Sequence, residues 1–313
     1  MLKKLFLSTA ATLAFAAPLS ASAQAVPTAP TAKPAAPAPA APPTTDADPA
    51  LWVVRDADTT IYLFGTVHVL KPGLSWFDEA VKTAFDKSDE VVLEIVSPSP
   101  EAAQAAIMTT AVNATGPSLT DRLPAGDRPR YTAALADLGV PAAAFDRLDP
   151  WFAATTMTMV KLQKAGYDPT SGAEATITAA AKAASKPVSA LETIEQQLGF
   201  FDSLSEPAQL ALMTETLKQL PDTEKTIGEM VAQWSKGDAE ALSETINEGL
   251  KTTPEIAKIL LNDRNERWAG WIAERMAKPG TVFIAVGAGH LAGSESVQRK
   301  LAAHKLSATR VAY

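Results

Sequence analysis

Two histidines of this sequence lie in the same local pattern, Gly-x-x-His, one from Gly65 to His68 and the other from Gly287 to His290. The chain has only three histidines, so the repetition indicates a paired role. Each pattern follows an apolar run, and glycine permits the sharp turn that places an imidazole at the carboxyl end of a strand. The pair predicts a metal or acid–base site at that edge of a sheet. The third histidine, His304, is expected on the solvated surface.

Carboxylates follow two further apolar runs. Glu94 ends the run 91–93, and Glu192 ends the run 188–191. A carboxylate is costly to bury unless it is paired or bound to a metal, so both are candidates for the same site. Glu174 opens a predicted helix, where it is either a partner of the helix dipole or a site residue.

Arg264 and Asn265 start the helix that precedes the last buried strand. A cation and an amide at that position can stabilise the negative charge that develops on an oxygen during hydrolysis. The alternative is that Arg264 forms a surface salt bridge with Asp263 or Glu266.

The elements that must position these residues begin with two strand-like runs, 51–54 and 60–64, which predict a hairpin ending at Gly65. Ser75 is predicted to cap a helix with its apolar face between residues 77 and 85, and a buried strand follows at 91–96. This order of elements is typical of the start of an α/β fold.

Helical patterns dominate residues 101–275, and one predicted strand, 187–191, interrupts them. A helix at 264–278, a buried strand at 281–286, a further helix and a last strand at 308–312 complete the chain. The sequence therefore predicts a mixed α/β (α+β) fold. Its central sheet is assembled from N- and C-terminal strands and covered by many helices of a helix-rich middle insertion.

The first residues have the features of a Sec-type signal peptide, predicted as 1–23, with Lys3 and Lys4 before the apolar run 5–19 and small residues at 21–23. A membrane anchor is the alternative, but that run is shorter than the roughly 20 residues that span a bilayer. Residues 24–49 are rich in Ala and Pro and predict a disordered linker. Residues 50–313 are then a single domain, periplasmic or secreted.

The composition narrows the chemistry further. The chain has no cysteine, which excludes disulfides, a thiol nucleophile and thiolate metal ligands. Its formal net charge of −7 does not favour binding to nucleic acid, and no membrane span is expected after signal cleavage. The oligomeric state is left open.

Taken together, these motifs resemble the TraB/GumN family, whose wider relatives include Tiki metalloproteases, erythromycin-esterase-like proteins and haem-binding ChaN-like proteins. The resemblance covers nearly all of residues 50–313. It is carried by the pieces Leu51-Trp52, Tyr62 to His68, Val92 to Ile95, Lys186 to Val188, Leu191 to Thr193, Leu260 to Asn265 and Val286 to Leu291. It implies an α/β fold with two Gly-x-x-His motifs and a glutamate in one site, and, in the Tiki branch, protease activity that depends on a divalent metal.

The leading expectation is an exported, metal-dependent hydrolase that cuts a peptide or a small amide or ester. A divalent ion, Mn, Co, Zn or Fe, would be held by three ligands: His68, Glu94 and His290. Glu192 would act as a general base or orient a ligand, and Arg264 and Asn265 would stabilise the oxyanion.

Two alternatives stay open at this stage. In the first, the hydrolase needs no metal, because one histidine activates water with the help of a glutamate. In the second, the chain is a non-catalytic envelope protein whose histidines bind haem iron or a polysaccharide-associated ligand.

Overall fold

A six-stranded mixed sheet forms the centre of the fold. The computed structural model describes residues 44–250 and 254–313, so the predicted signal peptide and most of the predicted linker lie outside the described residues. The strand order is β6-β5-β7-β3-β2-β8, with the bounds β2 Leu51–Arg55, β3 Thr59–Thr66, β5 Glu90–Leu93, β6 Val188–Ala190, β7 Gly280–Gly287 and β8 Thr309–Arg310. The predicted α/β class is therefore confirmed.

Pairing between the two ends of the chain holds this sheet together. The long strands β3 and β7 run parallel along their whole length, from Thr59 opposite Gly280 to Thr66 opposite Gly287. Strands β5 and β6 continue the parallel part, whereas β2 and β8 are antiparallel. Because β6, β5, β7 and β3 are parallel neighbours, their carboxyl ends meet at one edge of the sheet, as predicted from the sequence.

Helices cover both faces of the sheet, because apolar side chains point to both faces in turn along its strands. On β7, Phe283 and Ala285 pack toward α2 (Glu79–Lys87), α7 (Ala173–Ala183) and α10 (Thr223–Ser235). Val282, Ile284 and Val286 pack on the other face, toward α13 (Asp263–Arg275) and α14 (Val297–Lys300). Alternation with a period of two is what a strand buried on both sides requires.

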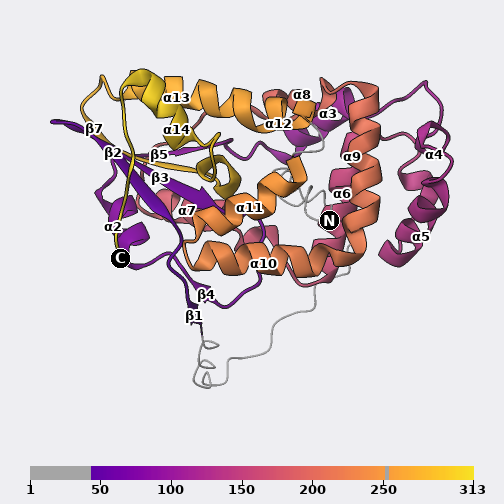
Figure 1. The fold of residues 1–313 in the computed structure, drawn as a ribbon, viewed down its shortest axis with the longest axis horizontal. Helices are drawn as coiled ribbons and strands as arrows, with labels where there is room; N and C mark the ends of the chain where they lie inside the picture. The colour runs from indigo at the N-terminus through magenta and orange to yellow at the C-terminus, as the bar shows by residue number, and fades with distance from the viewer. Residues whose placement is uncertain (1–43, 251–253) are drawn as a thin grey trace, which may run out of the picture.

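The remaining helices pack around a separate apolar core that contains Trp151, Met157 and Met213. Their bounds are α3 Pro100–Thr110, α4 Leu119–Arg122, α5 Arg128–Leu138, α6 Pro150–Lys164, α8 Ile194–Asp202, α9 Glu206–Gln219, α11 Ala239–Leu250 and α12 Pro254–Ala257, with a π-helix, η5, at Lys258–Asn262 and short 3₁₀ turns at Ala142–Ala144, Pro169–Ser171, Leu220–Asp222, Ala288–Leu291 (η6) and Leu301–His304. Helices α4, α5, α6 and α9 lie at the end of the molecule opposite the outer strands, whereas α11 lies beside the sheet (Figure 1). The helix-rich middle thus agrees with the prediction.

Several boundaries differ from the sequence prediction. The strand predicted at 91–96 ends at Leu93 and the helix predicted at 264–278 ends at Arg275, and two further differences lie near the start of the domain. The helix predicted from Ser75 begins at Glu79, because Ser75 belongs to a short strand, β4 (Leu74–Ser75), and its hydroxyl binds the Asp78 carboxylate. That strand pairs with β1 (Thr45–Asp46). Ordered structure among the described residues therefore begins inside the stretch predicted as linker, whose Ala47 is buried.

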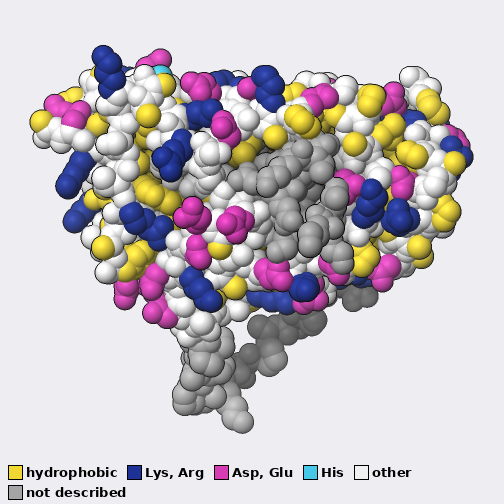
Figure 2. Space-filling model, in the orientation of Figure 1, with side chains coloured by type: hydrophobic (Ala, Val, Ile, Leu, Met, Phe, Trp, Pro, Cys, Tyr) yellow, Lys and Arg dark blue, Asp and Glu magenta, His cyan; other side chains and the backbone are white. Residues whose placement is uncertain are grey.

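Within the described part of the chain, no helix is long and apolar enough to cross a membrane. Figure 2 shows acidic side chains interspersed with basic ones over the uncovered part of one face. This mixture agrees with the composition of the chain, which has 35 acidic and 28 basic residues.

Candidate functional site

The carboxyl edge of the parallel strands gathers the residues that the sequence singled out. His68 follows β3, Glu94 follows β5 and Glu192 follows β6. His290 lies in η6 directly after β7, and α13 supplies the last two of the six: Arg264 and Asn265. Apart from His68, these side chains are joined by hydrogen bonds given below, and the imidazole of His68 approaches them across Gly287. The structure therefore brings all six together.

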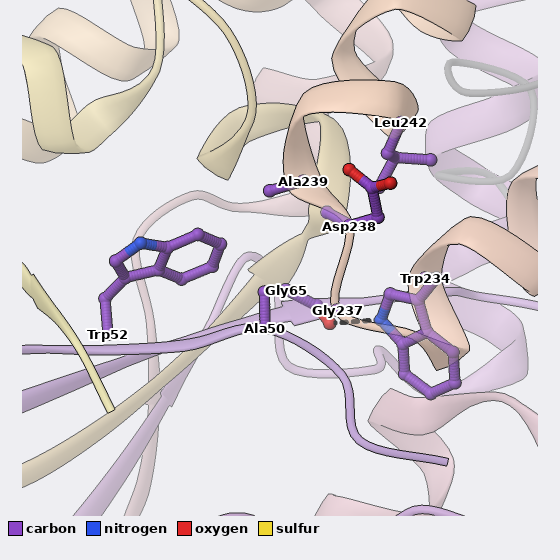
Figure 3. Close-up of a pocket in the computed structure, with 9 residues that line it drawn as sticks. Ala50, Trp52, Gly65, Trp234, Gly237, Asp238, Ala239 and Leu242 are labelled. Carbon is purple, nitrogen blue, oxygen red and sulfur yellow. Dashed lines mark hydrogen bonds between the residues drawn. The ribbon is translucent and has the colours of Figure 1, made fainter. Parts of the chain in front are cut away.

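The two Gly-x-x-His turns pack directly against each other. A Cβ atom added to Gly65 would lie 3.1 Å from the Cα and Cβ of Ala288, so a side chain at residue 65 would push the turns apart. The indole N–H of Trp234 donates to the Gly65 carbonyl oxygen over 2.7 Å and ties this turn to α10 (Figure 3). Close approach thus favours glycine at residue 65.

Gly287 leaves a small space between the functional side chains. A Cβ atom there would lie 3.1 Å from Oε1 of Glu94 and 3.3 Å from Nε2 of His68, with the ring of His290 at 3.7 Å. The backbone N–H of Gly287 also donates to Oε1 of Glu94 over 2.6 Å. A reacting atom placed beside Gly287 would therefore contact the imidazole of His68 and the Glu94 carboxylate.

The guanidinium of Arg264 lies between the two buried glutamates. Its Nη2 donates to Glu94 Oε2 and to Glu192 Oε2, both over 2.7 Å, and its Nε donates to Glu192 over 2.9 Å. Burial alone would raise the pKa of Glu94, but the charge of Arg264 and the N–H of Gly287 hold that pKa well below its usual range. Both glutamates are therefore ion-paired carboxylates.

Glu94, Glu192 and Arg264 form an ion-pair cluster, which makes further contacts with its neighbours. Nη1 of Arg264 donates to the Leu260 carbonyl oxygen over 3.2 Å and contacts Nε2 of His290 at 3.1 Å. Arginine has five N–H groups, and these contacts engage all of them within the described part of the chain. Gln197 donates to both carboxylates at 3.0 Å, and the indole of Trp268 donates to Glu192 at 3.1 Å. All N–H groups of Arg264 are therefore engaged, and Arg264 is not positioned as the free oxyanion donor that the sequence predicts.

His290 is held as a neutral imidazole. Asn265 Oδ1 lies 2.6 Å from Nδ1 of His290, and because an amide oxygen only accepts, Nδ1 carries the proton and Nε2 accepts from Arg264. Burial together with the charge of Arg264 lowers the pKa of His290 to about 3. The amide nitrogen of Asn265 donates to the Glu295 carbonyl oxygen over 2.7 Å. Asn265 thus orients His290.

A divalent metal ion does not fit this arrangement of ligands. Zinc and similar ions need nitrogen and oxygen ligands at about 2.0–2.2 Å, but the guanidinium of Arg264 already lies against Nε2 of His290 and a carboxylate oxygen of Glu94. Among the described residues, no group of three or more His, Asp or Glu side chains is arranged to hold a metal. Metal binding stays a prediction, and it requires Arg264 to move.

His68 pairs with a different carboxylate, Glu174 at the start of α7. Nδ1 of His68 lies 2.5 Å from Glu174 Oε1, and the Thr66 hydroxyl binds the same oxygen. Burial by itself lowers the pKa of His68, but the charge and hydrogen bond of Glu174 outweigh it and raise this pKa above its usual value. The His68 and Glu174 side chains are 14% and 24% exposed, against 3–9% for Glu94, Glu192, Arg264 and His290. Solvent therefore reaches the site from the side of His68.

Comparison with known proteins identifies the family of this chain. A family model described as TraB/PrgY/gumN matches residues 50–310. The chain belongs to the TraB/PrgY/gumN family. No curated protein and no solved structure matches it. The predicted family is therefore confirmed, and in this member of it the two Gly-x-x-His motifs, the strand-end glutamates and Arg264 form one edge of the sheet.

Three residues that contact the candidate site of this TraB/PrgY/gumN protein were not predicted from the sequence: Thr66, Gln197 and Trp268. Trp268 lies four residues after Arg264 on α13, so helical spacing was an available signal. Thr66 lies inside the first Gly-x-x-His motif, so its place in the motif was an available signal for its hydroxyl, which binds Glu174. Gln197 has no signal in the sequence, because its two carboxylate partners come together only through the sheet. Glu174, which the sequence offers as either a helix-dipole partner or a site residue, lies against His68.

The start of α7 positions His68 through a glycine. A Cβ atom on Gly172 would lie 2.1 Å from the His68 carbonyl oxygen. We predict that Gly172→Ala displaces the His68 turn, lowers the free energy of unfolding by about 1–3 kcal/mol and lowers any activity that depends on His68. Urea denaturation measures the first effect.

Gly199→Ala is the matched control for this prediction. Gly199 lies within α8, and nothing lies within 4 Å of a Cβ atom added there. Alanine is the better helix former by about 0.5–1 kcal/mol, so this variant should be as stable as the parent or more stable. Equal stabilities of the two variants would contradict the proposed packing of Gly172 on His68.

Proposed function

We propose that this protein is an exported hydrolase in which His68 acts as the general base, oriented by Glu174, on a peptide or a small amide or ester. One observation carries the proposal. Nδ1 of His68 contacts the Glu174 carboxylate at 2.5 Å, and Nε2 of the same ring faces the space beside Gly287. A carboxylate that accepts a hydrogen bond from the Nδ1–H group fixes the tautomer in which Nε2 can take a proton from water.

The chemistry follows from this geometry. A water molecule beside Gly287 gives a proton to Nε2 of His68 as its oxygen attacks the carbonyl carbon of the substrate. The bond to the leaving nitrogen or oxygen then breaks, and the leaving group takes the proton from His68. Proton transfer of this kind contributes roughly 10²–10⁴-fold to the rate of such reactions. Glu174 stabilises the imidazolium during the step.

In this proposal, the ion-pair cluster has a positioning role. Glu94 accepts from the Gly287 N–H, and Arg264 fixes both Glu94 and His290. The cluster therefore holds the wall of the reaction space rigid. Glu192 binds Arg264, Gln197 and Trp268, so its predicted role as general base is replaced by one in holding Arg264.

A metal-dependent hydrolase is the second candidate, as the sequence predicts, with Mn, Co, Zn or Fe. The observation that favours it is the approach of His68, Glu94 and His290 to Gly287. The two candidates differ in their response to a chelator. Hydrolysis of a panel of peptides and esters that survives EDTA would support the His68–Glu174 mechanism, whereas loss with EDTA and recovery with Mn²⁺, Co²⁺ or Zn²⁺ would support the metal mechanism.

Export and catalysis need separate tests. N-terminal sequencing of protein recovered from the periplasm or medium should give a start near Gln24, after the small residues 21–23. A start at Met1 would contradict export with cleavage. If no substrate in the panel is hydrolysed and haem titration gives a saturable absorption change, the chain is a binding protein and the hydrolase proposal fails.

The pH dependence provides a further prediction. The pKa of His68 is raised by Glu174, and the imidazole is a base only when neutral. The activity kcat/KM should therefore rise with pH, with an apparent pKa above the usual histidine value of about 6.5. In Glu174→Gln the charge that stabilises the imidazolium is absent, so the maximal rate falls and the apparent pKa moves to lower pH. An unchanged acid limb in Glu174→Gln would contradict the pairing.

A further inference from the structure

We propose that the guanidinium of Arg264 takes the place of a divalent cation, so that the buried cavity around it is a cation site filled by the protein itself. If the arginine side chain is removed, the same cavity should bind free guanidinium or a transition-metal ion. This inference concerns binding and stability, and it does not rest on the proposed hydrolysis.

The first argument is the set of atoms that surround the guanidinium. It contacts carboxylate oxygens of Glu94 and Glu192 at 2.7 Å and Nε2 of His290 at 3.1 Å. Two carboxylates and an imidazole are also ligands that divalent first-row metals accept. The lone pair on Nε2 points to the cation because Asn265 binds the other ring nitrogen, which is how ligating histidines are commonly fixed.

Charge supplies the second argument. Glu94 and Glu192 are 5% and 3% exposed in their side chains, and Arg264 is 5% exposed. The other hydrogen-bond donors to these carboxylates are neutral groups from Gln197, Trp268 and Gly287. A second cation, Arg267, lies 3.8 Å from Glu192 Oε1, but its side chain is 51% exposed and so offsets little of the buried charge. Without Arg264, two negative charges would share one buried cavity, which is unstable without a counter-charge. A guanidinium or a divalent cation would supply it.

The third argument is that Arg264 is held firmly in this position. The Leu260 carbonyl oxygen, in the π-helix Lys258–Asn262, accepts from Nη1. The guanidinium carbon also lies 4.7 Å from the centre of the Trp268 ring and 5.6 Å from that of Phe200. These contacts fix the position of the planar guanidinium. Its distances to Glu94 Oε2 and His290 Nε2 are 2.7 and 3.1 Å, which are longer than metal–ligand bonds. The parent protein should therefore exclude a metal from these atoms.

The experiment compares the parent chain, Arg264→Ala and Arg275→Ala, all without a metal-affinity tag. Arg275 is a matched control because it lies on the same helix and pairs with Glu90, away from the cluster. Thermal unfolding is recorded with millimolar guanidinium chloride against sodium chloride, and with Co²⁺ or Zn²⁺. Arg264→Ala should unfold at a lower temperature than the parent and regain roughly 5–10 °C when either cation is present at about 100 times its Kd. The parent and Arg275→Ala should show no such shift.

A calorimetric titration of the parent with Co²⁺ or Zn²⁺ keeps the inference testable even if Arg264→Ala does not fold. No binding at these atoms is expected. About one equivalent bound, and lost in Glu192→Gln, would overturn the inference, because it would place the metal in the cavity beside Arg264. A folded Arg264→Ala that gains nothing from guanidinium, Co²⁺ or Zn²⁺ would overturn it as well. Neither result depends on whether a substrate is hydrolysed.

Discussion

Glu192→Ala should lower the free energy of unfolding by about 3–5 kcal/mol, the usual effect of removing one partner of a buried ion pair. Glu192 accepts from Nε and Nη2 of Arg264 and from Gln197 and Trp268. Its removal leaves these N–H groups without an acceptor in a buried part of the protein, where each unsatisfied group is costly. Urea denaturation followed by circular dichroism measures the change.

The control for this prediction lies three residues along the chain. Glu195 is an exposed carboxylate in the first turn of α8, so Glu195→Ala should change stability little. A loss in Glu192→Ala no greater than that in Glu195→Ala would show that the ion-pair cluster does not form in solution. Glu192→Gln should fall between the two, because it keeps an acceptor for Trp268 and loses the charge that Arg264 requires.

His68→Ala should lower kcat/KM for any hydrolysed substrate by roughly 10²–10⁴-fold, while the fold stays intact. His68 lies on the solvent-accessible side of the site and is not part of the ion-pair cluster, so its removal breaks the contact with Glu174 and leaves the ion pairs of Arg264 in place. The measurement is kcat/KM at a fixed pH above the acid limb, with thermal unfolding to verify the fold.

Two comparisons make the His68 prediction specific. His304, an exposed residue, provides the control, and His304→Ala should keep full activity. If His68 and Glu174 act as one unit, adding Glu174→Ala to His68→Ala should cause little further loss. Retained activity in His68→Ala, or additive losses in the double variant, would contradict the proposed pair.

Much of the fold could be predicted because the strands of this chain are short apolar runs that end at glycine or a charged residue. The hairpin, the buried strand 281–286 and the edge strand 187–191 are confirmed as β2–β3, β7 and β6. The predicted helix start at Ser75 was wrong, since the serine signal is local and its pairing partner, Thr45–Asp46, lies in a segment with linker-like composition.

The sequence predicts which residues form the site better than it predicts what each of them does. Polar residues that follow buried strands must meet at the carboxyl edge of a parallel sheet, which is how His68, Glu94 and His290 were found. The sequence could not show that Arg264 would lie among them with every donor engaged, because that depends on the rotation of α13 and on the carbonyl of Leu260. The spacing of the motifs therefore does not reveal that the guanidinium of Arg264 is the cation between these ligands.

The pairing of β3 with β7 joins residues more than two hundred positions apart in the sequence. Contacts between residues so far apart form late in folding because a long loop must close first. A chain that is synthesised from its N-terminus would have completed β3 and the helix-rich middle before β7 exists. The site would therefore assemble only after synthesis is nearly complete, and until then the edge of β3 that pairs with β7 stays unpaired, which favours aggregation.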